Sequence, residues 1–288
     1  MKTEILVIGA SGNVGSEVVK CLLAQGVSVR AAGHFAEKVT QRFGAGVEAV
    51  PFDFTNPATF AEAFKGITQL FILRPPQISD IQKYMVPALE AAKAAGVKHM
   101  VFLSIIGIEQ NKIVPHYKVE QWLLASGLDY TFLRCSFFMQ NLNTTHRTEI
   151  HDHDEIYVPV GKAKTSFVDV RDIGAVAALA LTHPGHEKKA YDLTGCEALD
   201  YYQVADLFSQ VLGRKITYKN PPAVRFFIRQ VQNKTGLVYA LVTTWLYSNT
   251  RSGMADVVTG EVERLVGRKP ILMRQYIEDY KESWMRKS

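Results

Sequence analysis

The chain has 288 residues, 47% of them hydrophobic and 21% charged, and its net charge is +5 at pH 7. This balance is typical of a folded globular protein and excludes a disordered or fibrous chain. The basic residues are scattered among acidic ones, so no nucleic acid is expected as a direct partner. The longest apolar run, residues 237–247, is well short of the roughly 20 residues that span a bilayer, so no membrane partner is expected either.

The cysteines and the amino-terminal residues indicate the compartment. Cys21, Cys135 and Cys196 are odd in number and form no CxxC pair, which suits a reducing environment better than a disulfide framework. The first residues lead directly into the strand-like run 5–8 and lack the pattern of a signal peptide. We therefore expect a cytoplasmic protein.

The first half of the chain alternates short β-branched runs with helical patterns, as βαβ units do. Strands are predicted over residues 4–8, 28–32, 47–51, 69–73, 99–103 and 130–134. Helices are predicted over residues 14–24, 57–64, 81–95 and 117–125, with Gly26, Gly66, Gly96 and Gly127 as carboxyl-terminal caps. Short links between such elements require right-handed crossovers, so the predicted fold is α/β, a doubly wound parallel sheet of the Rossmann type.

The regular alternation of strand and helix patterns ends at residue 134. Residues 135–164 are irregular and polar, and a strand over 166–170, a helix over 171–181 and a strand over 190–194 then return to the sheet. From about residue 200 helices dominate, including 202–212 and 274–285, with one strand-like run at 215–219. We expect a dinucleotide-binding domain of residues 1–134 with about 166–195. Residues 135–165 and 196–288 would form a smaller, mainly helical cap that binds substrate at the carboxyl edge of the sheet.

The first predicted strand runs into "VIGASGNVGSEV", residues 7–18, with three glycines at three-residue spacing. Gly9 would make the tight turn, Gly12 would let the backbone approach a diphosphate, and Gly15 would let helix and strand pack closely. The helix amides and the positive end of its dipole would then hold the anion. The expected diphosphate-binding residues are Gly9, Ser11, Gly12, Asn13, Val14 and Gly15. A tight strand-to-helix turn without a ligand is the alternative.

The Gly-x-x-Gly-x-x-Gly spacing resembles that of extended and atypical short-chain dehydrogenase/reductases, and nearly the whole chain resembles their NmrA-like branch. The motifs are "GASGNVGSEVV" (9–19), "FDFTNP" (52–57), "ASGLDYTFLR" (125–134), "FFMQNL" (137–142), "SFVDVRDIGAVAALAL" (166–181), "YDLTG" (191–195) and "VTGEVERLVGRKP" (258–270). The resemblance implies that the chain binds NADP or NAD. It also implies one of two activities, because some members reduce quinones, dyes or azo compounds and others sense the redox state of the nucleotide.

The end of the second predicted strand bears on the choice between NADP and NAD. No carboxylate stands there to bind a ribose 2′-hydroxyl, which favours NADP and leaves NAD possible. The resemblance places a basic residue at His34, so His34, helped by Lys38 or Arg30, is the expected contact of the 2′-phosphate. A solvated loop residue is the alternative for His34.

The ends of the third and fourth predicted strands are expected to meet the rest of the cofactor. By resemblance, Asp53 and Phe54 flank the adenine; a helix cap is the alternative for Asp53, although Thr55 or Asn56 suits it better. Leu73 and Arg74 would pass beneath the nicotinamide ribose. The Arg74 guanidinium would touch phosphate or an acidic substrate, or face water.

The standard catalytic pair of short-chain reductases, Tyr and Lys four residues apart on one helix, is missing. No tyrosine in the chain has lysine four residues later, and Tyr117 has Gln121 there. Ser104 matches the serine position of the superfamily and could hydrogen-bond a carbonyl or the nicotinamide. His116 is expected either to line the reactive end of the cofactor, titrating near neutral pH, or only to begin a helix. Ser104, His116 and Tyr117 are the catalytic candidates.

Aromatic and acidic clusters follow the sixth predicted strand. Phe137, Phe138 and Asn141 are candidate substrate contacts, and a core role between the domains is the alternative. Residues 151–155 read His-Asp-His-Asp-Glu, which we interpret as a solvated loop, so no metal is expected.

The sequence thus predicts an NAD(P)H-dependent reductase of a small conjugated acceptor, quinone-like, azo or dye-like, that works by direct hydride transfer. The alternative is a noncatalytic NADP-binding sensor that signals to a protein partner. The sequence alone does not decide whether the protein forms a homodimer or binds a regulatory protein partner.

Overall fold

The computed structural model describes residues 4–233, 235–251, 253 and 255–286. The chain divides into two compact units. The first unit consists of Met1–Cys135, Val170–Leu193 and Glu261–Arg268, and the second of Ser136–Asp169, Thr194–Gly260 and Lys269–Ser288. Residues 261–268, which we expected in the cap, thus belong to the first unit.

The first unit is built on a seven-stranded sheet in which every pairing is parallel. Its spatial order is β3-β2-β1-β4-β5-β6-β8. The strand order reverses between the neighbouring strands β1 and β4. The chain after β1 continues to β2 on one side, and the chain after β4 continues to β5 on the other. Ligands of such sheets bind at the carboxyl ends of the strands at this point. The predicted doubly wound fold is confirmed. The strands are β1 (Ile5–Ile8), β2 (Val29–Gly33), β3 (Glu48–Pro51), β4 (Gln69–Leu73), β5 (His99–Ile105), β6 (Asp129–Cys135) and β8 (Lys189–Leu193).

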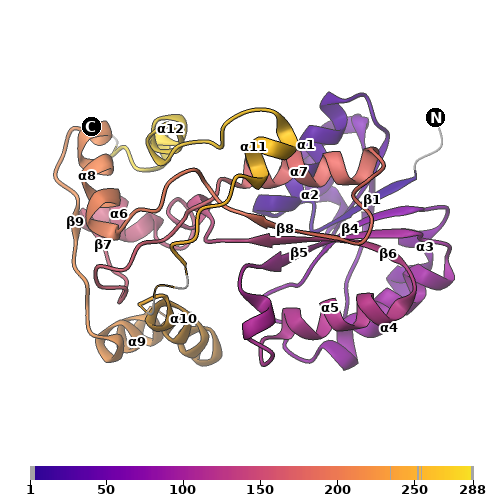
Figure 1. Ribbon diagram of the computed structural model, residues 1–288, viewed down its shortest axis with the longest axis horizontal. Helices are drawn as coiled ribbons and strands as arrows, with labels where there is room; N and C mark the ends of the chain where they lie inside the picture. The colour runs from indigo at the N-terminus through magenta and orange to yellow at the C-terminus, as the bar shows by residue number, and fades with distance from the viewer. Residues whose placement is uncertain (1–3, 234, 252, 254, 287–288) are drawn as a thin grey trace. The chain divides into compact units, whose positions relative to one another are not determined.

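Helices cover both faces of this sheet. Figure 1 shows α1 and α7 on one face and α4 and α5 on the other. The bounds are α1 (Asn13–Ala24), α2 (Ala36–Phe43), α3 (Phe60–Phe64), α4 (Ile81–Ala94), α5 (Pro115–Ser126), α7 (Val170–Thr182) and α11 (Glu261–Val266). The four glycines expected to end helices, Gly26, Gly66, Gly96 and Gly127, all have positive φ, the conformation that a carboxyl-terminal cap needs.

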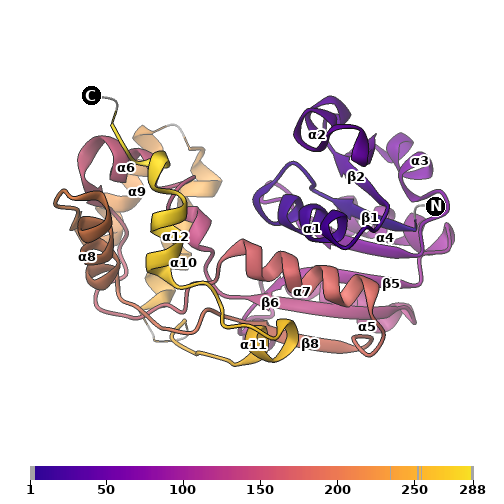
Figure 2. The ribbon, with the colours of Figure 1, turned by 90° about the horizontal axis from the view of Figure 1, so that it is seen from above.

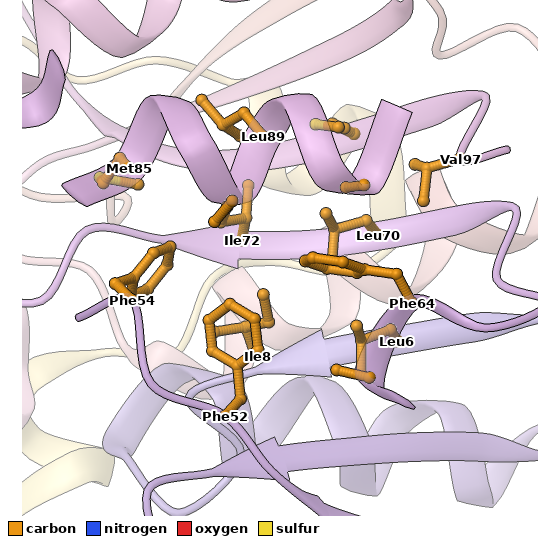
Figure 3. Close-up of a cluster of buried hydrophobic side chains, with 14 of the residues drawn as sticks. Leu6, Ile8, Phe52, Phe54, Phe64, Leu70, Ile72, Met85, Leu89 and Val97 are labelled. Atoms are coloured by element: carbon orange, nitrogen blue, oxygen red, sulfur yellow. The ribbon is translucent and has the colours of Figure 1, made fainter. Parts of the chain in front are cut away.

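The core on the α4 side of the sheet fixes the strands that carry the site. Leu70 and Ile72 of β4 are fully buried beneath Met85 and Leu89 of α4, as Figure 3 shows. Side chains from β1 and from the chain after β3, among them Ile8, complete the cluster. Parallel strands buried on both faces read as continuous apolar runs, which is why β1 and β4 were predictable from sequence.

The second unit is mainly helical and has a two-stranded parallel sheet, β7-β9. Its helices lie around a core that includes Phe208, Tyr276 and Trp284, and α8 lies near α12 in both Figure 1 and Figure 2. The bounds are α6 (Arg147–His153), β7 (Glu155–Ile156), α8 (Tyr201–Leu212), β9 (Thr217–Tyr218), α9 (Ala223–Gln232), α10 (Leu237–Thr250) and α12 (Met273–Asp279). No helix within the described ranges is long and apolar enough to cross a membrane.

Three local predictions were wrong. Residues 166–170 form no strand: Val170 begins α7, and the Ser166 amide bonds the Ala255 carbonyl instead of a neighbouring strand. The predicted loop over 151–155 overlaps α6, which continues to His153. The helix predicted over 274–285 ends at Asp279 and is followed by a 3-10 turn.

The contact between α1 and α7 yields a stability prediction. Gly174 of α7 is buried against Glu17 of α1, and a Cβ added to Gly174 would lie 2.8 Å from the carbonyl carbon and Cβ of Glu17. In an open helix, Gly→Ala stabilises by about 1 kcal/mol. Here we expect Gly174→Ala to lower the free energy of unfolding by about 1–3 kcal/mol, because the helices must move apart. Urea unfolding measures the change, and a variant at least as stable as the wild type would contradict this packing.

Candidate functional site

The glycine-rich turn after β1 is held by close backbone contacts. Gly9 has φ +77°, and its carbonyl accepts from the Gly12 amide at 2.9 Å. A Cβ at Gly15 would lie 2.2 Å from the Gly9 oxygen, a distance that no side chain tolerates. A Cβ at Gly9 would lie 2.9 Å from Cδ2 of Leu73, so Leu73 packs on the turn. Gly9 and Gly15 therefore let β1, α1 and β4 meet at one corner.

The amino end of α1 has no cap from a side chain. Gly12 occupies the cap position, no side chain hydrogen-bonds there, and the first turn contains no acidic residue. The amides of Asn13, Val14 and Gly15 lie in the first helical turn, where backbone N–H groups have no acceptor within the helix. Free amides and a positive dipole end in a twelve-residue helix fit an anion such as a diphosphate.

His34 and Asp53 face each other at the carboxyl ends of β2 and β3. Nδ1 of His34 lies 3.4 Å from a carboxylate oxygen of Asp53, and the His34 side chain is 64% exposed. Burial acts to raise the pKa of Asp53, but two hydrogen bonds from Thr55 and the nearby His34 hold it below its usual value. Asn56, not Asp53, caps the following turn by accepting from the Ala58 amide. Asp53 thus keeps a charged carboxylate at this edge.

The ring of Phe54 does not lie at the same edge. It is 5% exposed and packs edge to face against Phe52 in the core. An adenine at this position would meet mainly the backbone of Phe54.

The basic residues near the end of β2 have different roles. Arg30 is buried, pairs with Glu48 and donates to three backbone carbonyls, so it serves the fold. Lys38 is exposed and lies over the Phe35 ring. Arg42 donates to the Ser11 carbonyl and to the hydroxyl of Ser16, both at 2.9 Å.

Arg42 was absent from our sequence-based site. It follows Lys38 by four residues on α2, so the two cations share one face of that helix. That spacing is the signal that could have identified it. Its guanidinium has five N–H donors, and the two bonds to the glycine-rich corner use two of them.

Arg74 and His116 form a contact that changes the expectation for both. Nη1 of Arg74 donates to the carbonyls of Pro75, Pro76 and Ile78, and Nε lies 3.5 Å from Nε2 of His116. Burial, with the Arg74 charge adding to it, lowers the pKa of His116 to about 3. The predicted titration of His116 near neutral pH is therefore wrong, and its imidazole is neutral in the folded protein at pH 7.

Ser104 at the end of β5 belongs to a buried polar cluster. Its hydroxyl, on a residue 1% exposed, donates to Glu120 of α5 at 2.6 Å. Arg134 of β6 holds the same carboxylate through two bonds of 2.8 and 3.1 Å. The Ser104 proton is thus directed at Glu120 and not at a ligand. Tyr117, the third catalytic candidate, lies half-buried in the first turn of α5.

Two of the three candidate substrate residues line a cavity within the second unit. Phe137 and Asn141 border a space of about 200 Å³, whereas Phe138 is absent from its lining. A larger, more open pocket of about 850 Å³ shares Thr145, Gln230 and Tyr239 with it. The remaining residues of the smaller cavity are His146, Phe226, Thr243, Leu246 and Tyr247. An aromatic pocket beside a polar vestibule suits a flat organic molecule.

The acidic and histidine residues at 151–155 do not meet at one point. Within the described part of the chain, no group of three or more His, Cys, Asp or Glu side chains is placed to hold a metal ion.

The lowered pKa of His116 makes stability depend on pH. Its pKa is about 3 in the folded state and about 6.5 in the unfolded chain, so between these values the unfolded state binds the extra proton and stability falls as the pH falls. At pH 5 this loss is about 2 kcal/mol, whereas at pH 7.5 it is negligible. Glutamine keeps an acceptor for Arg74 but does not titrate.

We therefore expect His116→Gln to gain up to about 2 kcal/mol relative to the wild type when the pH changes from 7.5 to 5. Urea unfolding of both proteins at the two pH values measures it. A constant difference between them would mean that His116 titrates normally in the fold.

Comparison with known proteins identifies the family of the chain. The family model described as "NmrA-like family" matches residues 1–262. An NAD(P)H azoreductase of Xenophilus azovorans is 37% identical over 221 residues, which cover 74% of this chain and 76% of that protein. An NADPH-dependent quinone oxidoreductase of Escherichia coli, solved with NADPH, aligns with TM-score 0.86 and 22% identity over 96% of this chain and 99% of that one. A Citrobacter triphenylmethane reductase complexed with NADP(H) aligns with TM-score 0.81 and 24% identity over 94% and 98%. The chain belongs to the NmrA-like family.

Proposed function

We propose that this protein is an NADPH-dependent reductase of a small conjugated acceptor, with NADH as a weaker substitute. The observation that carries the proposal is the uncapped amino end of α1 behind the glycine-rich turn. The names of relatives support it, because they include an azoreductase, a quinone oxidoreductase and a triphenylmethane reductase.

The cofactor is held by the first unit in this proposal. The amides of Asn13, Val14 and Gly15 bind the diphosphate, and Leu73 packs beneath the corner that presents them. Oδ1 of Asp53 accepts from Thr55, and Oδ2, which receives no bond from Thr55, accepts from the adenine amine in this proposal. NADPH, when bound, supplies the hydride.

The preference for NADPH follows from the charges at the end of β2. His34, Lys38 and Arg42 bring basic groups to this edge, and His34 also lies beside the carboxylate of Asp53. A 2′-phosphate adds negative charge that these groups attract, whereas a 2′-hydroxyl gains little from them.

The acceptor is held by the second unit, in the cavity lined by Phe137 and Asn141. A quinone or dye takes up hydride without a dedicated acid, because solvent can protonate the product. Such a reaction does not require any of the three catalytic candidates to supply a proton. Ser104 donates to Glu120, His116 is neutral, and Tyr117 has no lysine four residues later.

The decisive variant is Gly12→Asp. Gly12 has φ −84° and ψ 177°, which any residue adopts, and it occupies the cap position of α1. An aspartate there caps the helix and preserves the fold, yet its carboxylate occupies and repels the diphosphate site. We expect unchanged or raised thermal stability, NADPH affinity lowered more than about tenfold, and loss of NADPH oxidation with a panel of quinones and azo dyes, followed by nicotinamide absorbance.

Gly12→Ala is the matched control. Its Cβ would lie 3.3 Å from the Gly9 oxygen, a tight contact that adds no charge, so NADPH binding should fall far less than in Gly12→Asp. Equal NADPH affinity in wild type and Gly12→Asp would overturn the proposed site. Tight NADPH binding by the wild type without turnover of any acceptor would instead favour the sensor.

Arg42 tests the coenzyme preference. Replacing it by alanine should raise the KM for NADPH about 3- to 10-fold, because an exposed charge-assisted contact is worth about 1 kcal/mol. The KM for NADH should change less than about twofold if Arg42 acts on the 2′-phosphate. An equal loss for both coenzymes would show that Arg42 only supports the turn through Ser11 and Ser16. Lys38→Ala provides the parallel measurement.

A further inference from the structure

Two neighbouring helices of the second unit, α9 and α10, expose apolar side chains to solvent. They pack against each other, and Figure 1 shows them side by side at the lower end of this unit, with α12 at its upper end. Arg251, directly after α10, donates to the side chain of Asn220, shortly before α9. The end of α10 thus meets the start of α9, and the two helices form an antiparallel hairpin.

Each helix of the hairpin has a buried side and an exposed side. Phe226 of α9 and Tyr247 of α10 are buried, with 5.6 Å between their ring centroids, and they join the hairpin to the core of the unit. The exposed side chains include six that are large and apolar, spaced three or four residues apart on α9 as one helical face requires. We call these six the hairpin surface: Val224, Ile228 and Val231 of α9, and Leu241, Val242 and Trp245 of α10.

The composition of α10 shows that this exposure is unusual. Its fourteen residues include no charged one, and a helix without a charged face is ordinarily buried. Isolated apolar side chains on a surface need no explanation, whereas several gathered together mark contact with a membrane or a protein. The hairpin surface therefore indicates a partner that covers it.

The charge of the surrounding segment indicates the chemistry of that partner. Residues 207–255 contain seven Lys or Arg and no Asp or Glu. Two of the seven form ion pairs with acidic residues outside the segment. Four others are exposed, namely Lys215, Lys219, Arg225 and Arg251. An apolar surface within a basic segment matches an anionic lipid bilayer, in which apolar side chains enter the headgroup region and cations stay beside the phosphates.

A second copy of the chain fits this surface less well. In a symmetric dimer the same surface meets itself, so the basic segments of both copies would come together. Residues 207–255 offer no carboxylate side chain to neutralise them. A lipid surface has no such conflict, and Trp245 is of a residue type that is enriched where membranes meet water.

We propose that the α9–α10 hairpin binds the surface of an anionic lipid membrane. The expectation of no membrane partner rested on the lack of a spanning segment, and a surface contact needs none: α10 is shorter than the roughly 20 residues that cross a bilayer. Phe226 and Gln230 of α9 and four residues of α10 also line the smaller cavity. On the proposed function, membrane binding brings that cavity close to acceptors dissolved in lipid, but the membrane contact itself does not rest on that function.

Cosedimentation of the full chain with vesicles measures the contact. One set of vesicles contains phosphatidylcholine alone, and the other contains equal parts of phosphatidylcholine and phosphatidylglycerol. We expect the partition coefficient for the anionic vesicles to be at least about tenfold higher, because each Lys or Arg near such a surface contributes about fivefold. Arg225→Gln should lower it about fivefold on the anionic vesicles and leave partition to the neutral ones unchanged.

Two leucines of similar exposure separate the hairpin surface from a general attraction of charges. Leu241 on α10 is 54% exposed, and Leu124 on α5 of the first unit is 49% exposed. Leu241→Gln should weaken binding to anionic vesicles about fivefold, because a half-exposed leucine loses its apolar contact with lipid. Leu124→Gln makes the same chemical change away from the hairpin, so its binding should equal that of the wild type.

Trp245 reports insertion directly. Its side chain is exposed, whereas Trp284 is fully buried in the core of the second unit. Anionic vesicles should shift the tryptophan emission to shorter wavelength as Trp245 leaves water. Trp245→Phe should remove this shift and keep most of the binding, because phenylalanine is still apolar. Thermal unfolding of each variant verifies its fold.

Three results would overturn the proposal. The first is no preference of the wild type for anionic vesicles. The second is an equal effect of Leu241→Gln and Leu124→Gln, which would reduce the binding to the general attraction of a protein with net charge +5. The third is a wild-type dimer in sedimentation equilibrium that Leu241→Gln dissociates, which would assign the hairpin surface to a second copy. NADPH turnover with a water-soluble quinone is measured without vesicles, so the reductase and the membrane contact fail or stand separately.

Discussion

The fold and the candidate site depend on one close contact, the approach of the Gly9 carbonyl to the start of α1. A Cβ at Gly15 would come within 2.2 Å of that oxygen, so the helix can begin where it does only because Gly15 has no side chain. Gly12, at the cap position, adds no side chain that could bond the first amides of the helix. Bare amides are thus left at the amino end of α1, where it packs against the turn after β1, and a diphosphate is the ligand that such amides suit.

Local pattern was enough to predict most of the first unit and less of the second. The bounds of β4 agree with the prediction, because a buried parallel strand is a continuous apolar run between clear breaks. Residues 166–170 have the same local character, but their backbone groups bond distant loop segments, as Ser166 does with Ala255. An extended run joins a sheet only if another strand lies beside it in the folded chain. The local sequence of the run does not specify which segment that is.

The residues of the candidate site likewise include some that local sequence predicts and some that it does not. Residues whose role lies in the backbone, such as Gly9 and Gly15, were predictable because only glycine meets the steric requirement. Residues whose role depends on a distant partner were not. The neutral state of His116 comes from burial and from Arg74, 42 residues earlier, and the proton of Ser104 is directed by Glu120 of the next helix. Arg42 was missed because its bonds reach Ser11 and Ser16 on another helix and turn.

The two units also differ in where their polar groups are directed. In the first, Glu120, Arg134 and Arg74 direct hydrogen bonds to protein atoms, so they hold the chain near the carboxyl ends of β4, β5 and β6 in place. In the second, Phe137, Phe226 and Tyr247 present aromatic walls to a cavity of about 200 Å³. Groups satisfied within the protein cannot distinguish one ligand from another, whereas the shape and the apolar walls of a cavity can. Within the proposed function, coenzyme choice resides in the first unit and acceptor choice in the second, so substitutions at Phe137 should alter acceptor preference while leaving the NADPH-to-NADH ratio as it is.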